Sequence, residues 1–436
     1  MKIGLAETAI TPPLGLQIPG YGPKKRLSSG IKDELYAKAM VIEANGTVLA
    51  FIVLDIISLD LEPAQRIRRR VNEYTGIPES QIMISCTHTH TGPPRPSGEA
   101  EKAYYPYLEA KAADAAIIAF GRRQEAKLGF GRGYEDSIAF NRRYYMKDGT
   151  VKTNPGILNP NIDRPEGPID PEVIVMRIDN EQGEPIGIVS NYACHTDTVG
   201  GTEYSGDFPA YVSQTVKKLY GEHVVSLFFQ GACGNINHHD VKGRIDPKIL
   251  PHHIRMGQIL GLEVARVRNR IKAVPEARKL ASASRIVTVS ERRPSGKELE
   301  WAHNHLEKLK QIPEDQWTSG QMLEKDRAEL YLRSVEQPLS ANDYEIQVCA
   351  VGELAIVALP AEIFVEFGLE IKEKSPFEYT VINELANGSG NGYVCTPLAH
   401  ANGSYEPSGL KFAPEAGGQF VHAALELLQE LYQQQS

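Results

Sequence analysis

The sequence has few cysteines and no long apolar run. Its 436 residues include five cysteines, an odd number, and no two of them are spaced as a Cys-x-x-Cys pair. This usage is typical of a reduced, intracellular chain and excludes a small disulfide scaffold. The most apolar stretch, from Val48 to Leu59, is shorter than the ~20 residues that a membrane-spanning helix needs, and it contains Asp55. We therefore expect no membrane span.

The sequence also lacks a block of basic residues. Lys and Arg total 47 against 55 Asp and Glu, which leaves a formal net charge of −8. An acidic chain without a Lys/Arg cluster argues against nucleic acid as a partner. The N-terminal segment has one Lys, an early Pro-Pro and no apolar core of a signal peptide, so we expect a cytoplasmic protein. The sequence leaves homo-oligomerisation open.

Strand and helix patterns alternate along the chain and predict an α/β fold, with mixed β-sheets flanked by helices. Two apolar runs around Asn45-Gly46 predict a β-hairpin. A helix is expected to begin near Ala361-Glu362. The charged, helical segment 292–343 interrupts the alternation and is interpreted as a surface insertion. We interpret residues 1–436 as a single domain that carries this insertion.

The histidines give the strongest indication of chemistry. His88 and His90 lie in the segment CTHTHTGP, just beyond an apolar strand. In an extended chain, residues i and i+2 point to the same face, so both imidazoles are expected to project together. Imidazole is a common ligand of zinc and other divalent ions. The alternative is a pair of histidines that form hydrogen bonds at the end of a strand.

Two further candidates also follow apolar strands. His195 precedes a Gly-rich loop with carboxylates, and Glu362 follows a buried strand and a proline. Glu362 either lies at a helix N-terminus, where the helix dipole favours a carboxylate, or completes a His/His/Glu zinc set. Asp207, in the loop after His195, is expected to cap a helix. Asp55 is expected either to hydrogen-bond a metal-ligating imidazole or to serve as a turn carboxylate.

The remaining histidines are given ordinary structural roles. His238, His239, His252 and His253 form two pairs, for which solvated or helix-capping roles are expected. The histidines of the charged insertion are expected at the surface.

Several motifs occur together in one order. They are THTHTGP at 87–93, FNRR at 140–143, YACHTDT at 192–198, FFQGACGNIN at 228–237, LPAEIF at 359–364, YVCTP at 393–397 and SYE at 404–406. With these motifs the chain resembles the neutral/alkaline non-lysosomal ceramidase family over most of its length. The resemblance implies the fold of that family's catalytic domain.

The resemblance also implies roles for individual residues. The family consists of zinc amidases that cleave the N-acyl bond of ceramide. By the resemblance, the ligands of Zn²⁺ are His88, His195, Glu362 and Tyr393. The same resemblance makes His90 a catalytic histidine, Arg142 a group that binds or polarises the substrate, and Tyr405 a second active-site tyrosine.

The chain departs from the family pattern at Asn237, which stands where the family has a serine. A seryl mechanism at this position is therefore not expected, although the Asn237 amide can donate a hydrogen bond to a developing oxyanion. The interpretation is a zinc-dependent amidohydrolase that uses metal-activated water on a small, soluble N-acyl substrate.

Three alternatives remain open. The same site would serve a zinc esterase, a lactonase or a deacetylase on a small polar substrate. A cysteine hydrolase would use Cys194 or Cys233 beside His195 or His238. A non-catalytic protein would only bind a metal or another ligand.

Overall fold

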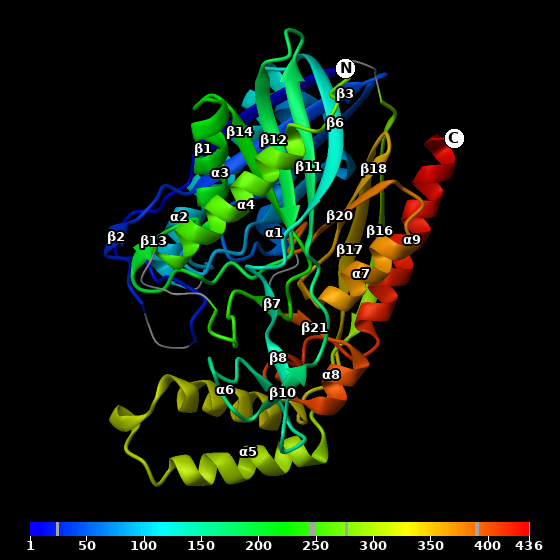
Figure 1. Ribbon diagram of the computed structural model, residues 1–436. Coiled ribbons are helices and arrows are strands. Elements are labelled where there is room, and N and C mark those ends of the chain that lie inside the picture. Colours follow the sequence, from blue (N-terminus) through cyan, green and yellow to red (C-terminus); the bar gives the residue numbers. More distant parts are fainter. Residues whose placement is uncertain (23–25, 97, 245–249, 275–277, 389–391, 436) are drawn as a thin grey trace.

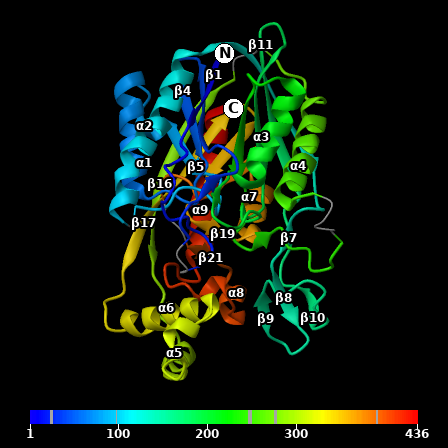
Figure 2. The same cartoon turned by 90° about the vertical axis from the view of Figure 1, so that its left-hand side faces the viewer.

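The computed structural model describes residues 1–436 apart from 23–25, 97, 245–249, 275–277, 389–391 and 436. Two β-sheets pack face to face, and helices cover both outer faces (Figures 1 and 2). The larger sheet has eight strands in the order β14–β12–β11–β6–β1–β3–β4–β5. These strands are β1 (Lys2–Ala9), β3 (Tyr36–Ala44), β4 (Thr47–Leu54), β5 (Ile82–Cys86), β6 (Gln124–Tyr134), β11 (Glu172–Asn180), β12 (Pro185–Tyr192) and β14 (Val225–Gln230).

The smaller sheet has four strands in the order β16–β17–β18–β20. They are β16 (Leu280–Ser290), β17 (Ala341–Val351), β18 (Leu354–Ala358) and β20 (Tyr379–Asn383). Parallel pairs, namely β12–β14, β4–β5 and β18–β20, occur beside antiparallel ones. Both sheets are therefore mixed.

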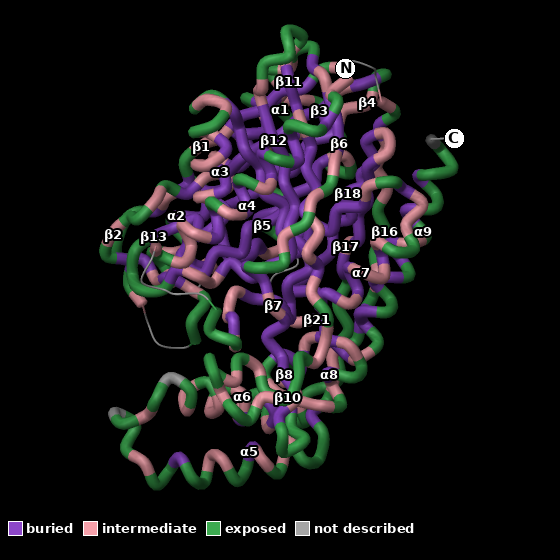
Figure 3. Tube along the Cα trace, viewed as in Figure 1, coloured by how far each residue is buried: buried purple, intermediate pink, exposed green. Residues whose placement is uncertain are grey.

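The side chains of strand β4 point alternately into two different hydrophobic cores. Its Phe51 and Val53 belong to the core between the sheets, whereas Ala50, Ile52 and Leu54 belong to the core under the outer helices. A strand that is buried on both faces is a continuous apolar run rather than an alternating one. The same burial extends through the middle of both sheets (Figure 3).

Three pairs of helices cover the outer faces. Helices α1 (Leu61–Thr75) and α2 (Glu99–Gly121), and then α3 (Asp207–Tyr220) and α4 (His252–Arg268), pack on the larger sheet. Helices α7 (Val365–Lys374) and α9 (Ala416–Gln435) pack on the smaller one. Within the described residues, none of the helices has the length and hydropathy of a membrane span.

This architecture confirms the predicted α/β class of mixed sheets flanked by helices. The predicted hairpin is present, since β3 and β4 are antiparallel neighbours around Asn45-Gly46. Asn45 has φ of 51° and Gly46 has φ of 81°, the positive values that a tight type I′ turn requires.

One predicted boundary is wrong. No helix begins at Ala361-Glu362, because Glu362–Ile363 form the short strand β19, which pairs in parallel with β21 (Tyr393–Val394). The helix α7 starts only at Val365. The pairing partner lies about thirty residues later in the chain, so a local pattern does not reveal it.

The segment 292–343 contains two helices, α5 (Gly296–Leu309) and α6 (Ser319–Ser334), which lie side by side and apart from the two large sheets (Figure 1). They are inserted between β16 and β17, whose paired residues extend to Ser290 and Ala341. Each helix begins with a capping box, in which the N-cap hydroxyl and the third side chain satisfy exposed backbone N–H groups. That the whole chain forms a single domain stays a prediction.

Candidate metal centre

Three buried imidazoles converge at the ends of strands from the larger sheet. His88 and His90 follow β5, and His195 follows β12. Nε2 of His88 lies 3.1 Å from Nε2 of His195 and 3.4 Å from Nε2 of His90. All three side chains are buried, and their ligand atoms lie within 4.8 Å of one another.

Glu362 completes this cluster from the smaller sheet's side of the molecule. Its Oε2 lies 3.4 Å from Nε2 of His88 and 3.7 Å from Nε2 of His195. This oxygen is buried and has no hydrogen-bond partner within the described residues. Two ligands of one tetrahedral zinc ion, each at ~2.0–2.1 Å, are about 3.3 Å apart. The observed separations fit such an ion.

Hydrogen bonds on the far side of two rings fix which nitrogen carries the proton. Nδ1 of His88 donates to the carbonyl of Ile57 over 2.7 Å, and Nδ1 of His195 to that of Cys233 over 3.3 Å. In a neutral imidazole the other nitrogen, Nε2, then carries a lone pair. When both imidazoles are neutral, two lone pairs and the Glu362 carboxylate therefore face one another, an arrangement that a bound cation stabilises.

The pKa values of the cluster follow from burial and mutual proximity. Burial opposes protonation of His88, but Glu362 beside it raises its pKa above the ordinary value. Burial and His88 together hold the pKa of His195 well below its usual range and lower the pKa of His90 to about 4. Although burial opposes ionisation of Glu362, His88 lowers its pKa. Glu362 is thus a carboxylate near neutral pH.

The expected route by which His88 and His90 come together is wrong. Strand β5 ends at Cys86, and His88 has a left-handed backbone with φ of 67° rather than an extended one. The two rings still meet, with centroids 4.9 Å apart and nearly perpendicular planes. A positive φ is costly for a residue with a side chain, so the surrounding structure must hold it.

Tyr393 lies beside Glu362, since the two residues are register partners in the β19–β21 pair. The guanidinium of Arg142 is 5.1 Å from the centroid of the Tyr393 ring, and the ring of Tyr405 is 5.6 Å away. Burial and Glu362 raise the pKa of Tyr393 well above its ordinary value. The structure therefore brings the two predicted tyrosines and the predicted arginine together next to the cluster.

Arg142 is held by Glu406, a residue of the SYE motif for which the sequence analysis predicts no role. Nε of Arg142 donates to Oε1 of Glu406 over 2.8 Å, and Nη2 donates to the carbonyl of Gly234 over 2.7 Å. Oε2 of Glu406 accepts from Nη1 of Arg143 over 2.6 Å. One buried carboxylate thus orients two buried arginines.

Asn237 directly follows Ile236 in the chain. The carbonyl of Ile236 accepts a hydrogen bond from the backbone N–H of His195 over 3.0 Å. The Asn237 side chain donates to Oδ1 of Asn154 over 2.9 Å and accepts from the backbone N–H of His239 over 3.1 Å. One of the two amide hydrogens is therefore committed to Asn154.

The structure decides between the two roles that were open for Asp55 and corrects the one expected for Asp207. Asp55 follows β4 and accepts from Tyr36 N over 2.9 Å and from Thr87 Oγ1 over 3.2 Å, as a turn carboxylate does, and not from an imidazole. A backbone carbonyl orients His88 instead. Asp207 is the first residue of α3 and not its N-cap, and it accepts from Val199 N over 2.8 Å.

The loop at Gly20 and Tyr21 also borders the cluster, although the sequence analysis assigns it no role. The Tyr21 ring lies 5.3 Å from that of His90, and its hydroxyl donates to the carbonyls of Asp197 and Val199. Gly20 has φ of 111°, and a Cβ there would come within 2.6 Å of His90. Only glycine fits this close approach. The triplet Gly-Tyr-Gly is the one local feature that marks this loop.

The other histidines are less solvated than expected. Nδ1 of His238 lies 3.0 Å from Oδ1 of Asp197, and both side chains are largely buried. The His253 ring packs against Tyr211, with centroids 5.0 Å apart. In the insertion His303 is exposed, as predicted, whereas His305 stacks on Trp301.

The structure disfavours a cysteine nucleophile. Burial raises the pKa of Cys194 and Cys233 well above the ordinary value, so neither thiol is ionised near neutral pH. Cys233 donates from Sγ to Oε1 of Glu384 over 2.9 Å. Burial also raises the pKa of Glu384, to about 8.

Comparisons with known proteins agree with these features. Residues 1–110 match the family model for neutral/alkaline non-lysosomal ceramidase, N-terminal. A curated neutral ceramidase from Pseudomonas aeruginosa is 25% identical over 264 residues, which make up 54% of this chain and 37% of that protein. The match thus spans little more than a third of the relative's length.

Solved structures show the same fold. The crystal structure of neutral ceramidase from Pseudomonas aeruginosa superposes with a TM-score of 0.75 at 19% identity, covering 99% of this chain and 74% of the other. A ceramidase complexed with C2 gives a TM-score of 0.74, also at 19% identity, over 99% and 75% of the two chains. These matches confirm the resemblance to the neutral/alkaline non-lysosomal ceramidases that the motifs indicate, in sequence over part of the chain and in fold over nearly all of it.

Proposed function

We propose that the protein is a metal-dependent hydrolase that cleaves the N-acyl bond of an amide. The observation that carries this proposal is the convergence of two imidazole lone pairs and one unpartnered carboxylate oxygen, from His88, His195 and Glu362, beside the buried Arg142. The names of the relatives, both ceramidases, support an amide as the bond that is cleaved.

Zinc is the metal that we propose. Two imidazoles and a carboxylate are a common donor set for catalytic zinc, and Tyr393 is the register partner of Glu362 in the β19–β21 pair. His88, His195, Glu362 and Tyr393 would hold the ion. When bound, such an ion supplies a Lewis acid and lowers the pKa of water.

The surrounding residues have distinct tasks in this proposal. Arg142 keeps its charge at any pH near neutrality and donates hydrogen bonds to the carbonyl oxygen of the substrate. Because Glu406 holds its guanidinium, Arg142 needs no reorganisation during the reaction. His90 is neutral near pH 7, so it accepts a proton from water and passes it to the leaving amine. Asn237 and Tyr405 donate to the oxyanion.

We further propose that the natural substrate is a soluble N-acyl compound and not a two-chain lipid. The chain carries a net charge of −8, which opposes binding to an anionic membrane surface. The segment 93–99, which follows the His88-x-His90 motif, has three prolines and contains no Leu, Phe or Trp. A lipid-docking edge needs such apolar side chains. A cytoplasmic location would agree with this substrate and is part of the proposal.

A paired assay tests this function. We expect kcat/KM for a short N-acyl amino compound to equal or exceed that for long-chain ceramide in detergent at equal concentration. A preference for ceramide of more than about tenfold, or ~1.4 kcal/mol of transition-state binding, would contradict the substrate proposal. Hydrolysis of neither substrate by protein that contains metal would contradict the catalytic proposal and favour a metal-binding protein without activity.

A further inference from the structure

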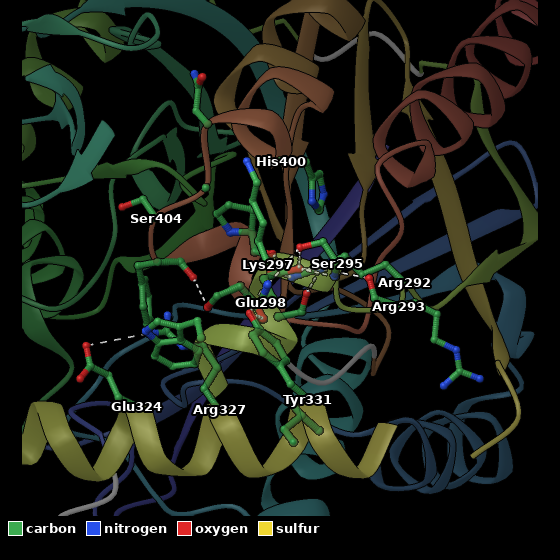
Figure 4. Close-up of a pocket in the computed structure, with 18 of the residues that line it drawn as sticks. Arg292, Arg293, Ser295, Lys297, Glu298, Glu324, Arg327, Tyr331, His400 and Ser404 are labelled. Carbon is green, nitrogen blue, oxygen red and sulfur yellow. Dashed lines mark hydrogen bonds and ion pairs between the residues drawn. The ribbon is translucent and has the colours of Figure 1, made fainter. Parts of the chain in front are cut away.

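A large cavity lies between the helices α5 and α6 and the segment from α8 (Pro397–Asn402) to the 3₁₀ turn Glu406–Ser408 (Figure 4). Its volume is about 1040 Å³, at the upper end of the range for small-molecule sites. Trp301, Leu323, Leu330 and Tyr331 give it an apolar wall. The cavity therefore suits a ligand with a substantial apolar part.

Two contacts connect this cavity with the metal centre. Tyr405 lines the cavity, and its ring lies 5.6 Å from that of Tyr393. Leu323 also lines the cavity and lies against Gly22, where a Cβ would be 3.2 Å from Leu323 Cδ1. Gly22 belongs to the loop whose Gly20 touches His90. The cavity is thus lined by two residues, Tyr405 and Leu323, that contact neighbours of the metal centre.

The lining is basic, in contrast to the acidic chain as a whole. Its four basic residues are Arg292, Arg293, Lys297 and Arg327, and its two carboxylates are Glu298 and Glu324. The chain as a whole carries −8. Such a local excess of positive charge favours an anionic ligand.

Two of the basic groups have no carboxylate partner in the part of the chain that the structure describes. Arg293 donates only to the backbone carbonyls of Ser334 and Gln337, and Lys297 forms no ion pair there. By contrast, Nη2 of Arg292 pairs with Oε1 of Glu298 over 2.8 Å. The cavity also contains a buried, unpartnered nitrogen, Nε2 of His400. Of these groups, the Lys297 ammonium is the cation best placed to bind a carboxylate, because Arg293 already donates to two carbonyls.

We propose that this cavity binds the amine half of the substrate, and that this half carries a carboxylate next to an apolar side chain, as in an N-acyl amino acid. The inference rests on the proposed function. The apolar wall around Trp301 takes the side chain, and the basic groups near Lys297 take the carboxylate. In hydrolysis the C–N bond breaks, the hydroxyl of water joins the acyl carbon, and its proton goes to the amine nitrogen. The products are a carboxylate and a free amino acid.

Binding is measured first, with a probe that has no N-acyl bond. The probe is the analogue of N-acetylphenylalanine in which a methylene replaces the amide nitrogen, used as its carboxylate and as the neutral primary amide. The chain has two tryptophans, Trp301 and Trp317, and only Trp301 lines the cavity. In a Trp317→Phe protein, Trp301 fluorescence therefore reports occupancy.

We expect saturable binding of the carboxylate with a Kd about fivefold lower than that of the amide, since one partly exposed charge pair is worth up to ~1 kcal/mol. Lys297→Glu should remove this preference. Lys308→Glu, the same change on an exposed residue of α5 outside the cavity, should preserve it. Both residues are exposed, so neither variant endangers folding.

A second measurement separates this inference from the proposed function. Values of kcat/KM are compared for N-acetylphenylalanine and N-acetylphenylalaninamide. Hydrolysis of both at equal rates, without a response of Trp301 to the probe, would overturn the assignment of the cavity and leave the amidase proposal intact. Binding of the carboxylate probe without hydrolysis of either compound would overturn the amidase proposal and leave the anionic site standing.

Discussion

Replacement of His195 by alanine is expected to abolish metal binding and amide hydrolysis together. Its Nε2 lies 3.1 Å from that of His88 and 3.7 Å from Oε2 of Glu362, so it is central to the cluster. Loss of a residue that merely supports a ligand costs ~10–100-fold in metal affinity. Loss of the ligand itself should cost more than about 100-fold.

Metal content by elemental analysis and hydrolysis of an N-acyl substrate are measured on the same preparation. The matched control is His422→Ala, because His422 lies on α9 with 76% of its side chain exposed. The control should keep both metal and activity. A His195→Ala protein that is folded and retains its metal and its rate would place the metal, or the chemistry, elsewhere.

Replacement of Glu406 by alanine is expected to lower both the stability of the protein and its activity. Its carboxylate is buried and accepts from both Arg142 and Arg143. Glu406→Ala leaves two buried guanidinium groups without this partner. Breaking a buried ion pair from one side typically costs ~3–5 kcal/mol. We expect a loss of that size in the free energy of unfolding.

Urea unfolding of the two proteins measures this loss, with Glu307→Ala as the control. Glu307 pairs with Lys310 on an exposed face of α5, where a salt bridge is worth less than ~1 kcal/mol. Glu406→Gln keeps the volume of the side chain and should recover part of the stability, but not the full activity, because Arg142 loses a charged partner. If Glu406→Ala were as stable as Glu307→Ala, the network around Arg142 would not be structural.

The elements of the fold that can be predicted from the sequence are those determined by residues that are neighbours in the chain. The Asn-Gly turn between two apolar runs identifies β3 and β4, since the turn geometry is determined by two adjacent residues. The local pattern at Glu362 predicts a helix start, whereas the structure has the strand β19 there, because its partner β21 is remote in sequence. The sandwich of two sheets likewise depends on pairings such as β1–β6 that no local period specifies.

In the site, too, the sequence identifies some residues and does not reveal the interactions that hold them. Motifs point to His88, His90, His195 and Glu362, and the structure brings these four together. The supporting interactions are not visible in the motifs. The carbonyl of Ile57 orients His88, and the left-handed backbone of His88, with φ of 67°, follows from no motif.

The cavity was equally hidden in the sequence. The charged segment 292–343 is predicted correctly as helical, but no sequence pattern shows that Leu323 in it lies against Gly22. Nor does its composition show which basic residues lack an acidic partner. Ion pairing within the segment, as between Arg292 and Glu298, depends on how the helices pack.

The central claim is that a metal ion in the cluster of His88, His195 and Glu362 is required for hydrolysis. It is tested most directly by elemental analysis of the purified protein, with N-acyl hydrolysis measured before chelation, after chelation and after zinc is restored. The account predicts about one zinc ion per chain, loss of hydrolysis when the ion is removed, and recovery in proportion to the zinc returned. Full hydrolysis by a protein without bound metal would contradict it.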